Sequence, residues 1–157
     1  MKISIFGLGY VGVVSAGCLA SRGHEIVGVD VNEPKVELLN TGVSPIVEKD
    51  LSKLLSQAKK KGLISATADA GYAIENTEIS LICVGTPSRP NGSLNTKYLE
   101  RICKQIGECL KNKQGSHVLV FRSTMLPGTN KETLIPLLEK TSGKKEGEDF
   151  FAAYNPE

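Results

Sequence analysis

Three glycines near the N-terminus have the spacing of a phosphate-binding turn. Gly7, Gly9 and Gly12 come directly after the apolar run 2–6 and open the helical pattern 11–23. In such a turn the first glycine permits the sharp change from strand to helix, the second lets the backbone approach a pyrophosphate, and the third lets the helix pack closely on the strand. N–H groups at the positive end of the helix dipole would then bind the phosphates. The spacing predicts a dinucleotide site, with a glycine-rich turn in an unrelated α/β fold as the alternative.

Asp30 is an acidic residue at the position where a dinucleotide site has a carboxylate for the ribose. Asp30 ends the β-rich run 25–30, and its carboxylate would accept hydrogen bonds from the hydroxyls of the adenosine ribose. Its charge would repel the 2′-phosphate of NADP, and residues 31–33 contain no arginine that would offset this repulsion. We therefore predict NAD as the cofactor. Lys35 would reach the ribose edge, or else be an exposed lysine of the following helix.

Polar residues also follow three later β-rich runs. The run 78–85 leads into Gly85, Thr86 and Pro87, the run 117–123 into Ser123 and Thr124, and the run 150–154 into Asn155, Pro156 and Glu157. Ligands of open parallel sheets bind outside the carboxyl ends of the strands, near the point where the strand order reverses. These residues are therefore candidates for contacts to the ribose and phosphates, with helix caps and turns as the alternative interpretation.

The elements that would position these residues alternate between strand and helix. β-rich runs are expected at 2–6, 25–30, 63–67, 78–85, 117–123 and 150–154, and helices at 11–23, from Pro34 to Gly42, at 48–60, 69–76, 96–111 and, despite Pro136, 131–140. The stretch 143–149 has the composition of a surface loop. Continuous apolar strands separated by helices indicate a parallel sheet covered on both faces, and right-handed crossovers make it doubly wound. We predict a three-layer α/β fold of the Rossmann type with about six strands.

Composition argues against several other classes of protein. The formal net charge of +2 is too small to favour nucleic acid or an anionic membrane as partner, and Lys59, Lys60 and Lys61 are expected at the C-terminal end of a helix. No stretch is apolar over the about 18 residues that a membrane-spanning helix needs. Four cysteines, without the spacing of metal ligands, predict buried thiols in a reducing cytoplasm and no metal site; they are Cys18, Cys83, Cys103 and Cys109.

Five segments together resemble one family. The segments KISIFGLGYVG, GHEIVGVDVNEPKVELLNTGVSPIVE, ICVGTPSRPNGSLN, RSTMLPGT and NPE are similar, in order and spacing, to the N-terminal domain of the UDP-glucose/GDP-mannose dehydrogenase family. The resemblance covers essentially the whole chain. Within the family, IFGLGYVG, SPIVE and TPSRPNGSLN are more similar to the branch that oxidises GDP-mannose than to the branch that oxidises UDP-glucose, which stays the alternative.

This resemblance implies an activity for a longer parent protein. The family oxidises the C6 alcohol of a nucleotide sugar to a uronic acid with two NAD molecules, through a cysteine thiohemiacetal and thioester. That cysteine, a long central helix that forms a homo-oligomer interface and the substrate domain come later in the family. The resemblance therefore implies that residues 1–157 are an NAD-binding fragment that does not turn over substrate. It also implies a cytoplasmic parent that supplies sugar acids for a polysaccharide.

The resemblance assigns roles to particular residues. Six residues match the family's NAD contacts, namely Tyr10, Val11, Asp30, Lys35, Thr86 and Thr124. Thr124 is also implied to order a water near the reacting carbon, and Glu157 matches the first glutamate of a substrate loop. Lys49-Asp50 replaces the Pro-Gly that the family usually has, and Ser93 and Asn95 stand where it has an acidic turn.

Two other interpretations stay open. One is a Rossmann module that senses a dinucleotide without chemistry, for which loss of polar residues at Thr86 and Thr124 would be the mark. The other is a different NAD(P) dehydrogenase, of the 6-phosphogluconate or hydroxyacid type. The presence of Thr86 and Thr124, and the pair of segments GYVG and RSTMLPGT, argue against both.

Overall fold

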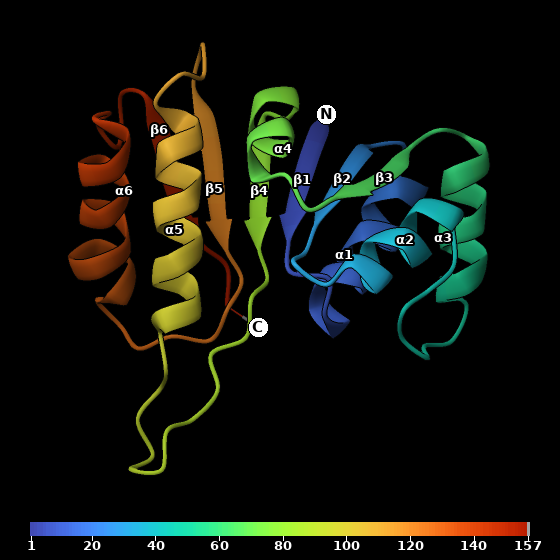
Figure 1. Cartoon of the computed structure of the whole chain (residues 1–157), viewed down its shortest axis with the longest axis horizontal. Helices are drawn as coiled ribbons and strands as arrows, with labels where there is room; N and C mark the ends of the chain where they lie inside the picture. The colour runs from blue at the N-terminus through green and yellow to red at the C-terminus, as the bar shows by residue number, and fades with distance from the viewer. Residues whose placement is uncertain (157) are drawn as a thin grey trace.

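The computed structural model describes residues 1–156 and consists of a six-stranded sheet between two layers of helices (Figure 1). In chain order the elements are β1 (Lys2–Phe6), α1 (Tyr10–Ser21), β2 (Glu25–Val29), α2 (Glu33–Thr41), α3 (Leu51–Lys60), β3 (Ile64–Thr67), α4 (Ala70–Asn76), β4 (Ile79–Ile82), α5 (Lys97–Leu110), β5 (His117–Phe121), the π-helical turn η1 (Asn130–Leu134), α6 (Ile135–Ser142) and β6 (Phe150–Tyr154). The strand order is β3-β2-β1-β4-β5-β6, and every neighbouring pair is parallel. The order reverses between β1 and β4, which confirms the doubly wound fold of the Rossmann type.

Each face of the sheet has its own apolar core. On one face α4, α5 and α6 cover the strands, and the core includes Phe6, Leu99 and Phe121. On the other face α1, α2 and α3 provide the cover, and the core includes Ile5 and Val13. Because the central strands are buried on both sides, their sequences are almost continuously apolar, and this continuity is the signal from which the parallel sheet was predicted.

Four polar side chains interrupt this apolar interior as a hydrogen-bonded row. The hydroxyl oxygens of Ser4 on β1 and Ser80 on β4 lie 2.6 Å apart, and Nε2 of His117 on β5 lies 2.7 Å from the Ser80 oxygen. Oγ1 of Thr77 lies 3.0 Å from the Ser4 oxygen at the other end of the row. All four side chains are buried. Burial, and secondarily the charge of Lys113, lowers the pKa of His117 to about 4, so the imidazole is neutral at physiological pH.

Two helices differ from the sequence-based expectation for reasons visible in the backbone. The helix expected over 48–60 begins only at Leu51, because Asp50 adopts φ +61° and ψ −8°, a left-handed conformation that a helix cannot contain. The helix expected over 131–140 consists of η1 followed by α6. Pro136 lies inside this continuous helical stretch, as expected, at the start of α6 where the π-helical turn passes into α-helix.

The prediction for the cysteines is right for one residue and wrong for another. Cys103 is buried in the core beneath α5, whereas Cys18 is exposed; Cys83 and Cys109 are partly buried. Cys18 is exposed because α1 turns Val13, Ala16 and Ala20 toward the sheet, which directs position 18 to solvent. Within residues 1–156, none of the four forms a disulfide.

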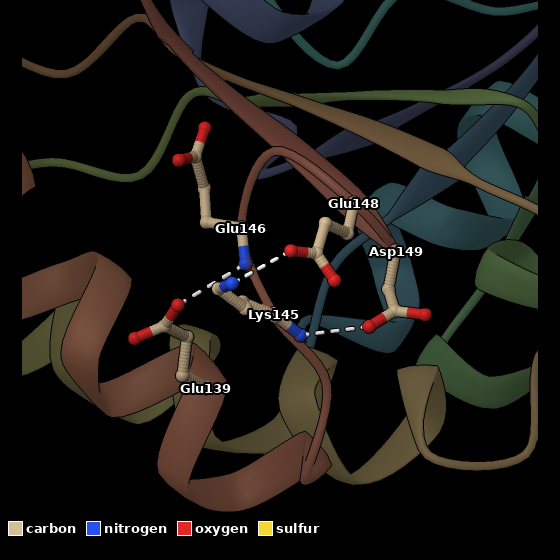
Figure 2. Close-up of polar contacts among 5 residues, drawn as sticks. All are labelled: Glu139, Lys145, Glu146, Glu148 and Asp149. Atoms are coloured by element: carbon tan, nitrogen blue, oxygen red, sulfur yellow. Dashed lines mark hydrogen bonds and ion pairs between the residues drawn. The ribbon is translucent and has the colours of Figure 1, made fainter.

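The connection 143–149 between α6 and β6 is a surface turn, as predicted, and Figure 2 shows the contacts that order it. The backbone N–H of Lys145 donates to Oδ2 of Asp149 over 2.9 Å, and its ammonium donates to Oε1 of Glu148 over 2.6 Å. The N–H of Glu146 donates to Oε1 of Glu139 over 3.1 Å, which ties the turn to α6. The carboxylates of Glu139, Glu148 and Asp149 therefore stabilise the conformation of this turn.

The connection between β4 and α5 extends well beyond the sheet as an arm (Figure 1). Its tip is a small hairpin, in which the N–H of Arg89 donates to the Ser93 carbonyl over 2.7 Å. Gly92 adopts φ +79° there, a conformation that suits glycine. The arm leaves the sheet at the same edge as the glycine turn after β1, because both follow the carboxyl ends of neighbouring parallel strands.

Candidate functional site

The turn between β1 and α1 needs glycine at its first position. Gly7 has φ +97°, and a Cβ there would lie 2.9 Å from the carbonyl oxygen of Cys83 on the neighbouring chain segment. The N–H of Gly7 donates to the carbonyl of Val29 over 2.8 Å, which fixes the turn against the end of β2. Backbone conformation and space therefore both exclude a side chain at this position.

The other two glycines of the motif have different surroundings. A Cβ on Gly12 would lie 1.9 Å from the carbonyl oxygen of Gly7, so the close packing of α1 on the turn that the spacing predicted is present. A Cβ on Gly9 would meet no protein atom within 4 Å. The space in front of Gly9 is therefore open, and any need for glycine there would come from a ligand. The first hydrogen bond within α1 runs from the N–H of Val13 to the carbonyl of Gly9 over 3.0 Å, and no side chain caps this helix end.

The carboxylate of Asp30 is held rigidly beside this turn. Its Oδ2 accepts a hydrogen bond from the N–H of Leu8 over 2.7 Å, and its Oδ1 accepts one from the N–H of Asn32 over 2.9 Å. Each carboxylate oxygen has a second acceptor site, so both oxygens keep capacity for a further donor. The side chain is therefore pre-oriented by the backbone and still able to bind hydroxyl groups.

A cavity of about 640 Å³ lies at the carboxyl ends of β1, β2 and β4. Of the residues proposed from the sequence, it is lined by Gly7, Gly9, Asp30, Lys35, Gly85 and Pro87. It is also lined by residues that the sequence analysis missed, namely Val31, Cys83, Val84, Tyr98, Arg101, Ile102, Lys104, Gln105 and Glu108. Most of these missed residues come from one side of α5, and the spacing of Tyr98, Arg101, Ile102 and Gln105 along that helix is the signal that would have found them.

A smaller cavity of about 140 Å³ shares part of this wall. It is lined by Val11, Cys83, Val84, Gly85, Thr86, Arg122, Ser123 and Thr124. The hydroxyl of Thr86 donates to the carbonyl of Thr124 over 2.6 Å, which joins the ends of β4 and β5. The hydroxyl of Ser123 is buried and donates to the carbonyl of Val84 over 2.6 Å, so its hydrogen is used within the protein.

Three of the proposed residues lie apart from these cavities or cannot be placed. The side chain of Tyr10 is exposed, and its hydroxyl donates to Oε2 of Glu48 over 2.5 Å. Gly12 lies behind the turn, within α1. Glu157 lies outside the described residues. Arg122, which the sequence analysis did not select, donates from Nη1 to Oδ1 of Asn155 over 2.9 Å and so connects the ends of β5 and β6.

Two structural findings concern other classes of site. Among residues 1–156, no helix is long and apolar enough to cross a membrane. In the same part of the chain, no three His, Cys, Asp or Glu side chains are grouped so that they would hold a metal ion.

Comparisons with known proteins agree with this geometry. The model of the UDP-glucose/GDP-mannose dehydrogenase family, NAD binding domain, matches residues 1–157. Among curated proteins, the GDP-mannose 6-dehydrogenase of Pseudomonas syringae pv. syringae is 54% identical over all of this chain and 36% of its own length. The UDP-glucose 6-dehydrogenase AglM of Haloferax volcanii is 36% identical over the same shares. The chain thus spans about a third of the length of these relatives.

Solved structures give the same result. The ternary complex of the GDP-mannose dehydrogenase from Pseudomonas aeruginosa matches with a TM-score of 0.98 and 52% identity, over all of this chain and 36% of that one. A UDP-glucose dehydrogenase from Pyrobaculum islandicum matches with a TM-score of 0.92 and 37% identity, over 99% of this chain and 35% of that one. The chain therefore belongs to the UDP-glucose/GDP-mannose dehydrogenase family as its NAD binding domain.

Proposed function

We propose that NAD binds along the two cavities at the carboxyl ends of the strands, with its adenosine half in the larger one. The observation that carries this proposal is the pairing of Asp30 with Gly9 in one cavity. A fixed carboxylate with spare acceptor capacity stands beside an open, uncapped helix end. Ribose hydroxyls and a pyrophosphate are the groups that these two features recognise.

The proposed site residues would contact different parts of the cofactor. Asp30 would accept from the ribose hydroxyls, with Lys35 at the ribose edge, and the helix end after Gly9 would receive the pyrophosphate through the N–H groups that begin at Tyr10 and Val11. Gly85, Thr86, Pro87, Ser123 and Thr124 would line the path toward the nicotinamide. When bound, NAD supplies a hydride acceptor; the chain itself supplies orientation, because Thr86 and Thr124 hold the ends of β4 and β5 together.

The activity of a longer parent protein follows from similarity. We infer a nucleotide-sugar 6-dehydrogenase that oxidises GDP-mannose to GDP-mannuronate, because the GDP-mannose 6-dehydrogenases are 52–54% identical to this chain and the UDP-glucose relative only 36%. UDP-glucose, or another UDP-sugar, is the second candidate substrate. Thr124 would order a water near the reacting carbon, and Glu157 would contribute to the substrate side.

We infer from the family resemblance that the catalytic nucleophile lies outside this chain, and two of the four cysteines agree with this inference. Burial, and secondarily the charge of Glu100, raises the pKa of Cys103 to about 12. Burial, followed by the charges of Asp69 and Glu108, raises the pKa of Cys109 as well. A thiolate is the reactive form of cysteine, so neither residue suits nucleophilic attack. Together with the family resemblance, this leads us to expect that the 157-residue chain binds NAD without oxidising a nucleotide sugar.

The setting of the parent protein is part of the same proposal. Thiols that form no disulfide within residues 1–156 fit a reducing compartment, and we infer a cytoplasmic enzyme of polysaccharide synthesis. From the family resemblance we also infer that the parent protein assembles as a homo-oligomer. Light scattering of the parent protein would test the oligomer.

Isothermal titration calorimetry of the 157-residue chain with NAD and NADP tests the cofactor site. We expect NAD to bind more tightly, because the Asp30 carboxylate repels a 2′-phosphate. Equal affinity for the two cofactors would refute the role of Asp30, and absence of NAD binding would refute the site. Addition of GDP-mannose and NAD should produce no NADH absorbance; NADH formation would show that the chain by itself catalyses at least the first oxidation, from alcohol to aldehyde.

A further inference from the structure

Tyr10, the first residue of α1, has a partner from a distant part of the chain. Its hydroxyl donates to Oε2 of Glu48, in the segment 43–50 that connects α2 to α3. The other carboxylate oxygen of Glu48 accepts from the N–H of Lys49 over 3.1 Å. The acceptor is therefore itself held in place, although the contact lies at the surface.

The segment 43–50 is attached to the body of the domain independently of this contact. Ile46 packs on the apolar core beneath α1, whereas Val47 is fully exposed. Leu51 then packs against Gly17 of α1, where a Cβ would lie 2.7 Å from its Cδ1 atom. Apolar contacts thus attach the segment to the domain on both sides of Glu48, so the bond to Tyr10 is not the only contact that holds it in place.

The position of Tyr10 in the turn decides what the bond would do. Tyr10 stands between Gly9, whose surroundings are open, and Val11, which lines the smaller cavity. The first hydrogen bond within α1 is donated only by Val13, so the backbone of the preceding residues is fixed less by the helix than by their other contacts. A tether on the side chain of Tyr10 therefore restrains the backbone that would face a pyrophosphate.

We propose that Glu48 is a positioning residue of the dinucleotide site, whose carboxylate holds the Tyr10 phenol and thereby orients the first turn of α1 toward the pyrophosphate. This inference rests on the proposed NAD site. It gives the segment 43–50 a role in cofactor affinity although none of its residues lines either cavity.

The charge of Glu48 has an opposite effect that the experiment must separate. A carboxylate beside a phosphate site repels the ligand, so removal of the charge by itself would tighten binding. Glu48→Gln removes the charge and keeps an oxygen that accepts from the phenol, whereas Glu48→Ala removes both. Tyr10→Phe removes only the donor. Lys49→Ala is the matched control, because it changes the neighbouring residue without touching the bond.

Calorimetric titration of the 157-residue chain with NAD and with ADP-ribose tests the inference. Glu48→Ala and Tyr10→Phe should each weaken both ligands by about three- to tenfold, the factor that one partly exposed hydrogen bond provides. The double variant should be no weaker than either single variant. The Glu48→Gln variant should bind both ligands at least as tightly as the unsubstituted 157-residue chain. The Lys49→Ala variant should bind them with the same affinity as the unsubstituted chain.

The other outcomes each overturn the inference. Unchanged affinity of Glu48→Ala, with or without a lower melting temperature, would show a purely structural contact. Additive losses in the double variant would show that the two residues act separately, and an effect on NAD but not on ADP-ribose would place the role at the nicotinamide. Tighter binding by both Glu48 variants would show that charge repulsion dominates. If the unchanged chain bound neither ligand, the proposed NAD site would fail and this inference with it.

Discussion

The carboxylate of Asp30 and the backbone N–H of Leu8 are joined by a hydrogen bond of 2.7 Å that ties the end of β2 to the glycine turn after β1. The same carboxylate accepts from the N–H of Asn32, at the start of α2. One side chain thus organises two backbone segments and also forms part of the cavity wall. Substitution of Asp30 should therefore lower both the stability of the domain and its affinity for the cofactor. A control variant that lowers stability alone separates the two effects.

Asp30→Ala should weaken NAD binding by about 1–3 kcal/mol, the range for hydrogen bonds that involve a charged group. It should also lower the free energy of unfolding by about 1–2 kcal/mol, because two N–H groups lose their acceptor. Calorimetry and urea unfolding measure the two effects. Asp69→Ala is the control, since Asp69 accepts from the N–H groups of Gly71 and Tyr72 at the start of α4 and lines neither cavity. The Asp69→Ala variant should lose about as much stability as Asp30→Ala, and its affinity for NAD should be unchanged.

Gly9 and Gly12 should respond oppositely to substitution. Gly9→Ala or Gly9→Val should leave the melting temperature nearly unchanged, because a Cβ at this position meets no protein atom within 4 Å, and should reduce NAD affinity more than tenfold by steric exclusion of the pyrophosphate. Gly12→Ala should destabilise the fold by about 3 kcal/mol or more, because its Cβ would overlap the carbonyl oxygen of Gly7. Thermal unfolding and NAD titration distinguish the two. A folded Gly9→Val variant with full affinity would show that the pyrophosphate lies elsewhere.

His117 should make the domain sensitive to mild acid. Its pKa is lowered in the folded chain to about 4, whereas the unfolded chain has the ordinary value of about 6.5. The unfolded state therefore binds more protons between these values, and stability is lost as pH falls through this window. Between pH 7.5 and pH 5 the loss should be about 2 kcal/mol. Urea unfolding at both values measures it.

The variant His117→Gln provides the comparison for this pH effect. Glutamine does not titrate, and its amide extends about as far from the backbone as Nε2 of histidine, the atom that contacts the Ser80 hydroxyl. At neutral pH the variant should be less stable than the unsubstituted chain. On acidification it should lose less stability than the unsubstituted chain. An equal loss in both proteins would assign the acid sensitivity to other groups.

Asp50 should be replaceable by glycine but not by a β-branched residue. Its φ of +61° makes it the one described residue other than glycine with positive φ. Asp50→Gly removes this strain at the cost of a more flexible unfolded chain, so stability should rise or stay within about 1 kcal/mol. Asp50→Val should lower it by about 1–2 kcal/mol. Lys49→Val, at a neighbouring position without positive φ, serves as the control in thermal unfolding.

Most of the fold could be predicted from local sequence patterns. The apolar continuity of the strands, the glycine after β1 and the acid after β2 are properties of short segments, and all six strands and the doubly wound arrangement agree with what they predicted. Two predictions were wrong. At Asp50 a left-handed residue shortened a helix, and at Cys18 the packing of α1 left the side chain exposed rather than buried.

The sequence by itself determined the family, the parallel sheet and the residues that end its strands, because each depends on spacing within a few residues. Only the tertiary structure decided which distant residues meet. The wall that α5 adds to the cavity, the contact of Tyr10 with Glu48 and the buried row from Thr77 to His117 join positions that are separated by tens of residues in the chain. Such contacts depend on how helices pack on the sheet, and this packing is set by the whole core rather than by any local pattern.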